Sequence, residues 1–426
     1  MKTYVINQHK NTRVPFLRGI LVRTLLEAGM PFERAYDLAT LLRDQLSAEE
    51  EVSSERLRQM VSGLLLKAGE EVVQKQYLSP LAAPARILVT SQGGSESTFS
   101  RSKHQRYLQS SGVRAADAER ITTIIFDQLL AAGAISVSTA KLSYLTWLCL
   151  QQELGKSAAQ KYLVWMEFQH SGRPLILLIG GAVGTGKSSI ATEIAHRLEI
   201  VRTQSTDMLR EVMRTMIPKK LLPILHCSSF DAWKTLPVQA KKSRNKDTLI
   251  AEGYRSQVDL LALPCEAVMQ RAIKESVPLI LEGVHSHPDL LYRLSGQNDA
   301  LLVHVTLAVM NYPDLQARLR GRGVEVPQRR SRRYLKKFDS IWRLQSFLVS
   351  EAERCDTPVI PNDDREAAIF QVIGTINSEL SRHFSGRPAD VFGGGLKALK
   401  GMTRGKPWHK AVPLLVTTKS STAGIK

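Results

Sequence analysis

The 426-residue chain has little cysteine and no long apolar run. Its four cysteines, Cys149, Cys227, Cys265 and Cys355, lie far apart and form no C-x-x-C pair. This spacing argues against a disulfide framework or a zinc site and fits reduced thiols. No apolar stretch approaches the roughly eighteen residues that a membrane-spanning helix requires, and the first residues lack the apolar core of a signal peptide. We therefore expect a cytoplasmic protein without a membrane partner.

Acidic residues are scarce in two segments, and these segments carry most of the net charge of +18. Residues 316–345 contain ten Lys or Arg and two acidic residues, and residues 381–426 contain nine and one. The remainder is nearly balanced. A basic excess spread over one face would favour nucleic acid. Two separate basic segments instead require two separate explanations, and the tail keeps nucleic acid as a less favoured alternative.

One motif dominates the middle of the chain. An apolar run from Pro174 to Ile179 is followed by GAVGTGKS at 181–188 and then by a segment with helical periodicity. This strand–loop–helix order predicts a phosphate-binding loop, whose glycines turn backbone N–H groups toward phosphate oxygens. Lys187 would reach the β- and γ-phosphates of ATP, and the Ser188 hydroxyl would ligate Mg²⁺. The residues expected to bind the nucleotide are Gly181, Gly184, Thr185, Gly186, Lys187, Ser188 and Ser189.

Strand-like and helix-like segments alternate over residues 172–382. The expected strands are 175–179, 199–203, 279–282, 301–307 and 358–360; the expected helices are 188–198, 207–216, 257–275, 314–319, 334–353 and 365–381. Such alternation predicts an α/β domain with a parallel sheet covered by helices on both faces. Its active site would lie at the carboxyl ends of the strands. The tail, residues 386–426, is rich in Gly, Lys, Ser and Thr, and we expect it to be largely disordered.

Two carboxylates follow expected strands. Asp207 begins a helix after the second strand, where it could orient or deprotonate an acceptor hydroxyl; helix capping by Ser205, Thr206 or Asp207 is the alternative. Arg210 in the same helix is assigned to the substrate. Glu282 ends an apolar strand and could help hold Mg²⁺ together with Ser188, or it could simply face solvent.

Other residues near these strand ends could contact the substrate. Tyr254, Arg255 and Gln257 follow Gly253 at an expected helix start, where free N–H groups would favour an anion; an exposed helix terminus is the alternative. His285 and His287 form an H-x-H pair. A metal pair is conceivable, but no third ligand is evident, so substrate contact by His285 is favoured, with a plain loop histidine close behind.

An arginine-rich segment surrounds a Gly/Pro-containing turn. Guanidinium groups pair bidentately with phosphates, so a segment of this kind can close over the substrates and exclude water. We assign Arg318 and Arg322 to catalysis, and Arg329 and Arg330 to the substrate. A solvated helix face and an RNA-contacting patch are alternatives, but Tyr334, Phe338 and Trp342 have the spacing of a buried helix stripe rather than of a base-stacking platform.

Residues 1–80 and 86–168 form an internal repeat. Phe16 to Gly29 aligns with Phe99 to Gly112, and each copy combines a short β-like run with amphipathic helical segments. The repeat resembles the ATP-cone, a small, mainly α-helical nucleotide-binding regulatory domain, most closely in the second copy with Ser138-TAKL and Leu154-GKSAAQKY. Neither copy has the Lys-Arg-Asp-Gly hairpin that holds phosphates in typical cones. A helical scaffold that only positions the following domain is therefore the alternative.

The chain also resembles the 2-phosphoglycerate kinase family over about residues 86–380. The matching stretches are Ile179-GGAVGTGKSSIA, Ser205-TDMLREVMR, Gly253-YRSQ, Ile280-LEGVH and Arg332-RYLKKFDSIWRLQSFLVSEA with Val359-IPN. The resemblance implies a P-loop kinase fold and a phosphotransferase that moves the γ-phosphate of ATP to the free hydroxyl of 2-phosphoglycerate, giving 2,3-bisphosphoglycerate.

Two alternatives to this function remain open. Plant relatives are linked to phytic acid metabolism, so a P-loop kinase acting on inositol phosphates or another polyanion is one. A nucleotide-dependent nucleic-acid-binding or regulatory protein is the other. In the leading interpretation the partner is a small phosphorylated acid, and the sequence leaves formation of a homo-oligomer open.

Overall fold

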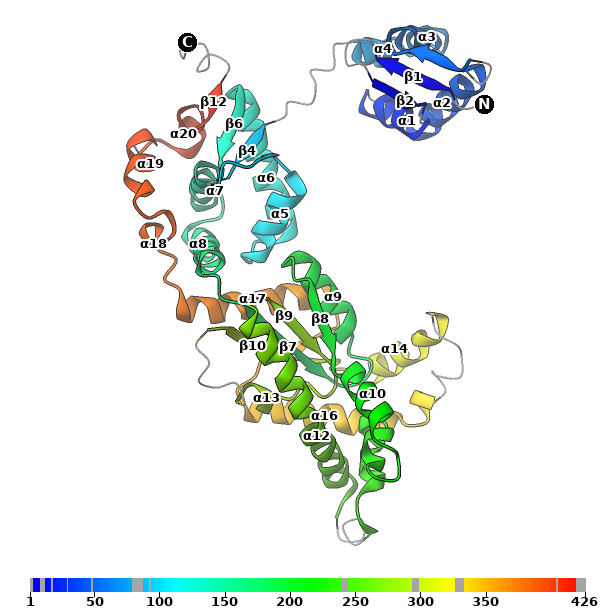
Figure 1. Cartoon of the computed structure of the whole chain (residues 1–426), viewed down its shortest axis with the longest axis vertical. Helices are drawn as coiled ribbons and strands as arrows, with labels where there is room; N and C mark the ends of the chain where they lie inside the picture. The colour runs from blue at the N-terminus through cyan, green and yellow to red at the C-terminus, as the bar shows by residue number, and fades with distance from the viewer. Residues whose placement is uncertain are drawn as a thin grey trace. The chain divides into compact units, whose positions relative to one another are not determined.

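The computed structural model describes residues 3–7, 12–16, 18–28, 30–46, 49–78, 87–91, 93–238, 244–292, 299–325, 333–403 and 405–418 (Figure 1). The chain forms two compact units, Met1–Arg86 and Ile87–Lys426. In these described ranges no helix is long and apolar enough to cross a membrane.

The first unit is a small sheet covered by helices. Its elements are β1 (Tyr4–Asn7), β2 (Thr12–Pro15), α1 (Arg18–Glu27), α2 (Phe32–Leu46), β3 (Glu51–Ser53), α3 (Ser54–Lys67) and α4 (Glu71–Leu78). Strand β1 pairs antiparallel with β2 and parallel with β3. Leu25, Leu42, Leu46 and Leu65 are fully buried between the helices and form its core.

The second unit begins with the same arrangement. Its first elements are β4 (Leu88–Thr90), β5 (Glu96–Thr98), α5 (Arg101–Ser110), α6 (Ala115–Ala131), β6 (Ala134–Ser138), α7 (Thr139–Glu153) and α8 (Lys156–Ser171). Strand β4 pairs antiparallel with β5 and parallel with β6, as β1 does with β2 and β3. The repeat found in the sequence therefore has a structural counterpart in both element order and strand pairing.

A five-stranded, all-parallel sheet forms the centre of the second unit. Its strands are β7 (Leu175–Gly181), β8 (Arg202–Ser205), β9 (Leu279–Glu282), β10 (Leu301–Ala308) and β11 (Val359–Pro361), in the spatial order β11-β10-β7-β9-β8. The helices around it are α9 (Lys187–Arg197), α10 (Thr206–Met216), α12 (Lys246–Lys274), α13 (Asp289–Tyr292), α14 (Tyr312–Glu325), α16 (Phe338–Arg354) and α17 (Arg365–His383).

Helices cover both faces of this sheet, as expected. Side chains of β7 alternate: Leu177 and Ile179 pack with α9 and α17, whereas Ile176 and Leu178 pack with α12. Every residue of β7 is buried, which explains its continuous apolar sequence. The second strand begins at Arg202 rather than at 199, because Glu199 adopts a left-handed conformation with φ 56° just after α9.

The observed start of helix α12 differs from the expected one. It starts at Lys246, where the Asn245 side chain accepts from Thr248 N at 2.8 Å, and not near residue 253. Gly253 is inside the helix. A side chain there would collide with the backbone of Trp233 in the 3₁₀ segment η2 (Ser229–Thr235), so this glycine marks a close helix contact. The backbone N–H groups of residues 253–257 therefore form hydrogen bonds within the helix. They are not free to bind an anion, contrary to the expectation from the sequence.

The expectation of a largely disordered tail is wrong for its described residues. They form α18 (Pro388–Phe392), α19 (Gly395–Thr403), α20 (Trp408–Leu415) and β12 (Thr417–Thr418). The tail, orange to red in Figure 1, returns to α7 and α8, and β12 pairs with β6. Its sparse apolar residues are spaced to bury one face, with Leu399, Trp408, Val412 and Leu415 in the core of the second repeat. The described lysines of α19 and α20, Lys397, Lys400 and Lys410, are exposed.

We predict that Trp408→Ala destabilises the second unit by about 3–5 kcal/mol, because it removes a buried aromatic side chain and leaves a cavity. Chemical denaturation would measure the loss. Lys410→Ala is the matched control, since Lys410 is exposed on the same helix and should change stability by less than about 0.5 kcal/mol. Equal stability of Trp408→Ala and wild type would show that the tail is not part of this core.

Candidate active site

The glycine-rich loop lies between the end of β7 and the start of α9. Gly181, Gly184 and Gly186 all have positive φ, at 135°, 94° and 86°, a conformation that side chains disfavour. A Cβ on Gly186 would collide with the Asn362 amide. The loop thus requires glycine for both conformation and space, and it directs the free N–H groups of the first turn of α9 toward the carboxyl edge of the sheet.

The polar side chains of the loop have different roles. Thr185 is buried, and its hydroxyl donates to the Ala182 carbonyl at 3.0 Å, so it stabilises the loop itself. The Lys187 ammonium donates to the same carbonyl at 2.8 Å, which holds this cation over the loop. Ser188 and Ser189 are exposed in the first turn of α9.

Ser188 and Glu282 meet, as the sequence suggested. The Ser188 hydroxyl donates to Glu282 Oε1 at 3.1 Å, and Glu282 is 8% exposed at the end of β9. One hydroxyl and one carboxylate suit Mg²⁺, which keeps water ligands and is completed by substrate phosphates. Within the described ranges no cluster of three or more His, Cys, Asp or Glu side chains could hold a metal, so the His285–His287 pair lacks support as a metal site.

Asp207 and Arg210 belong to α10, which begins directly after β8, beside the end of β9. The Ser205 hydroxyl caps the helix by accepting from Asp207 N at 3.2 Å, so the Asp207 carboxylate is not needed as the cap. It is 57% exposed and lies 3.3 Å from Arg210 Nη2. Arg210 Nη1 donates to the Cys227 carbonyl at 2.7 Å. Asp207 is therefore held beside a cation and open to solvent.

Tyr254, Gln257 and His285 are buried, with exposed fractions of 0%, 0% and 1%. Their polar atoms are used within the protein: the Tyr254 hydroxyl donates to the Val284 carbonyl, and Gln257 Oε1 lies 2.8 Å from His285 Nε2. A ligand cannot reach them in this arrangement. These three side chains are therefore not placed to contact substrate directly, contrary to the expectation from the sequence. They instead support the surrounding backbone and one another through hydrogen bonds.

Burial lowers the pKa of His285 to about 3. The nearby Asp207 carboxylate opposes this shift, while Arg210 and Lys187 reinforce it. All three charges thus act on one imidazole. Lys187, Asp207 and Arg210 therefore all lie near enough to the His285 ring to influence its pKa.

Arg255 and His287 belong to a different cluster. Arg255 pairs with Glu351 of α16 at 3.0 Å. His287 lies 3.3 Å from Asp289 and 3.5 Å from Glu351, and burial lowers its pKa. Arg255 thus has a carboxylate partner, and the cluster ties α12, α16 and the segment after β9 together.

Part of the arginine segment also approaches the loop. Arg318 Nη2 donates to the Asn362 carbonyl, and its Nη1 is 4.0 Å from the position of a Cβ on Gly186. Arg333 Nη2 donates to the Ser228 hydroxyl at 3.3 Å. Arg322 is in α14, but its side chain lies outside the described residues, as do Arg329 and Arg330 entirely. The two described ends of the segment therefore contact Asn362, beside the glycine-rich loop, and Ser228, which follows Cys227.

The aromatic residues of this region form a packed stripe. Tyr312 contacts Phe338 and Trp342 edge to face, with centroids 4.5 and 5.3 Å apart. Tyr334 packs against the same cluster and lies 6.2 Å from Phe230. Rings that pack on one another offer little face to a base. This supports the helix-stripe interpretation over the RNA-contacting one.

Asn362 is a site residue that was not singled out from the sequence. Its Nδ2 donates to the Thr185 carbonyl at 2.7 Å, its backbone N donates to Ala308, and its carbonyl accepts from Arg318. It thereby joins the glycine-rich loop to α14. Two signals could have identified it: its position just after the edge strand β11 and its place in the stretch Val359-IPN that carries the family resemblance.

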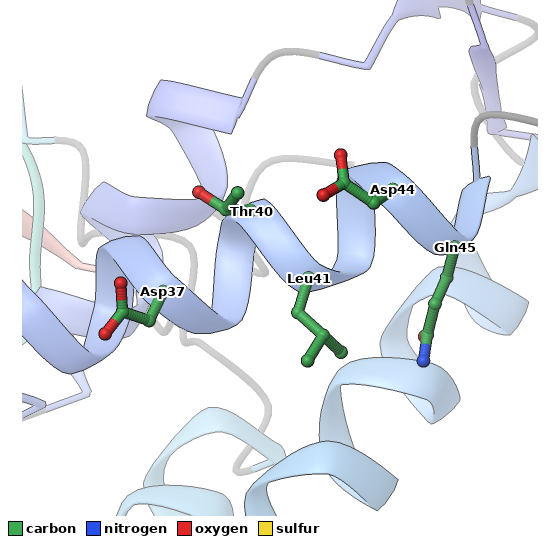
Figure 2. Close-up of a pocket in the computed structure, with 5 residues that line it drawn as sticks. All are labelled: Asp37, Thr40, Leu41, Asp44 and Gln45. Carbon is green, nitrogen blue, oxygen red and sulfur yellow. The ribbon is translucent and has the colours of Figure 1, made fainter.

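The first unit offers a hollow of a different kind. Figure 2 shows that its lining residues all project from α2; they are Asp37, Thr40, Leu41, Asp44 and Gln45. Two of these five are carboxylates and none is basic, so they do not suit a phosphate. The hollow therefore adds no second nucleotide site in this unit.

Comparison with known proteins found no family model that matches the chain. It did find similar 2-phosphoglycerate kinases. The protein of Pyrococcus horikoshii is 31% identical over 293 residues, which cover 69% of this chain and 94% of that protein. The Pyrococcus furiosus protein is 34% identical, with 65% and 89% covered. The Methanopyrus kandleri protein is also 34% identical, with 67% and 85% covered.

Three buried histidines predict loss of stability in acid. Burial lowers the pKa of His104 to about 4 and of His285 and His304 to about 3, against about 6.5 when unfolded. Below pH 6.5 the unfolded chain therefore binds protons that the folded chain does not. Stability should be full above this pH and fall by up to about 1.4 kcal/mol per pH unit per histidine down to about pH 4.

Urea unfolding between pH 7.5 and 5 would measure this slope. His304→Gln should reduce the slope, whereas exchanging the exposed His409 for Gln should not. A stability that is constant from pH 6.5 to 5 would contradict burial of these histidines in neutral form.

Proposed function

This chain belongs to the 2-phosphoglycerate kinase family, and we propose that it transfers the γ-phosphate of ATP to 2-phosphoglycerate, giving 2,3-bisphosphoglycerate and ADP. The proposal rests on one observation above all. The glycine-rich loop after β7, Glu282 at the end of β9 and the exposed Asp207 just after β8 lie at the carboxyl ends of adjacent parallel strands. A phosphate donor and a hydroxyl acceptor can meet there.

In the donor half, loop N–H groups and Lys187 bind the β- and γ-phosphates. Lys187 exchanges its contact with the Ala182 carbonyl for phosphate oxygens of higher charge. Ser188 and Glu282 would hold Mg²⁺, which would offset negative charge on the phosphates. Gly181, Gly184, Gly186 and Ser189 complete the cradle, and buried Thr185 supports it from within.

In the acceptor half, Asp207 orients the free hydroxyl and takes its proton as the new phosphorus–oxygen bond forms. The bond from the γ-phosphorus to the β,γ-bridging oxygen breaks, and this oxygen leaves with ADP. Arg210 pairs with the acid groups of 2-phosphoglycerate. The guanidinium groups of Arg318, Arg322, Arg329 and Arg330 stabilise the moving phosphoryl group.

This function gives each part of the chain a role. Residues 172–382 form a P-loop kinase domain. Residues 1–80 and 86–168 are ATP-cone-like domains, and residues 386–418 complete the second one by packing against α7 and by pairing β12 with β6. The arginine-rich segment binds phosphate groups of the substrates. About half of the net positive charge is thereby explained without a nucleic-acid partner.

Phosphorus NMR of purified protein with Mg-ATP tests the acceptor. We expect 2,3-bisphosphoglycerate and ADP in equal amounts from 2-phosphoglycerate, and no turnover with 3-phosphoglycerate. Phosphorylation of inositol phosphates in place of 2-phosphoglycerate would keep the kinase chemistry and overturn the acceptor. ATP consumption with none of these acceptors phosphorylated would contradict both.

We predict that Lys187→Ala lowers kcat/KM by at least about a thousandfold, because a preorganised charge on the transferring phosphoryl group is lost. The fold should remain intact, since the ammonium donates to the Ala182 carbonyl of the loop and the side chain is not part of the buried core. Thermal unfolding provides the control. Wild-type turnover in this variant would contradict the assignment of the loop as the site that binds the phosphates of ATP.

A further inference from the structure

We propose that Gln257 and His285 are positioning residues that fix the acceptor half of the active site by a buried relay of hydrogen bonds. The relay runs from Thr206, at the start of α10, through His285 and Gln257 to the carbonyls of Ile224 and Cys227. The inference rests on the proposed function only in naming the substrate whose binding it affects.

The hydrogen bonds define the orientation of the Gln257 amide. Gln257 Nε2 lies 2.7 Å from the Ile224 carbonyl and 3.2 Å from the Cys227 carbonyl. Both carbonyls only accept, so the NH₂ group must face them. Gln257 Oε1 then faces His285 Nε2 at 2.8 Å and requires a donor.

This orientation also determines the tautomer of His285. Its proton must be on Nε2, because Gln257 Oε1 can only accept. Nδ1 therefore carries a lone pair and faces the Thr206 hydroxyl at 3.4 Å. The ring lies parallel to Tyr254, with 7° between the planes, and it is 1% exposed. Neither ring nitrogen can neutralise the Asp207 carboxylate, which lies 4.0 Å from Nδ1.

The relay reaches the substrate-facing residues through a shared carbonyl. The Cys227 carbonyl accepts from Gln257 on one side and from Arg210 Nη1, at 2.7 Å, on the other. At the other end, Thr206 is fully buried and directly precedes Asp207. Gly283 packs so closely on the Thr206 side chain that a Cβ would collide with its hydroxyl. The relay thus sets the positions of both Arg210 and Asp207.

Gln257→Met tests the relay, because methionine fills a similar volume but donates no hydrogen bond. The Ile224 carbonyl loses its Gln257 donor, and the Cys227 carbonyl keeps only Arg210. We expect the KM for 2-phosphoglycerate to rise about ten- to hundredfold, with the KM for ATP changed less than about twofold. Asn377→Leu is the matched control: Asn377 is a buried amide that also donates to two carbonyls, those of Ser110 and Ile373, away from the site.

A rise in both KM values, or an equal effect of Asn377→Leu, would overturn the positioning role. A second readout does not depend on activity. In ¹⁵N-labelled wild-type protein, His285 should show a protonated Nε2 and an unprotonated Nδ1 between pH 6 and 8, with its signals assigned by their absence from His285→Gln. A proton on Nδ1, or an imidazolium, would refute the relay. If wild type phosphorylates no acceptor, the proposed function fails while this NMR result still decides the relay.

Discussion

The candidate site depends on the register of three parallel strands. Glu282 is aligned with Ile179 of β7 on one side and with Ser205 of β8 on the other. The three strands therefore end within two residues of one level, and the segments that follow them start side by side. This places the glycine-rich loop, Glu282 and the start of α10 together, although they are far apart in sequence. A shift of one residue in β9 would turn Glu282 to the opposite face of the sheet and remove the partner of Ser188.

Much of this arrangement could be predicted from local patterns. The loop motif, the alternation of strands and helices, and the two carboxylates at strand ends are signals within a few residues of one another. Burial could not be predicted in the same way. Tyr254 and Gln257 look like surface residues after a glycine, but α12 begins seven residues before Gly253. Tyr254 packs beside His285 and Phe347, and Gln257 donates to the carbonyls of Ile224 and Cys227. Asn362 acquires its role only when β11 joins the sheet beside β10.

The second repeat and the sheet share contacts that no local pattern could reveal. Asn377 of α17 donates to the Ser110 carbonyl at the end of α5, and the Ser110 hydroxyl donates to Arg197 at the end of α9. The helix that begins at the phosphate loop is thus anchored at its far end by the repeat. The tail returns to the same repeat. Both are long-range effects, which explains why a basic, glycine-rich composition was a poor guide to the tail's structure.

The central claim is that one site holds the phosphate donor on the β7 loop and the acceptor beside Asp207. Rapid quench measurement of γ-phosphate transfer by Asp207→Asn, at saturating ATP, tests it most directly. The account predicts ATP binding equal to wild type and transfer to 2-phosphoglycerate slowed about 10²- to 10⁴-fold, the usual range for loss of a general base. Transfer at the wild-type rate would show that the acceptor is activated elsewhere and would contradict the account.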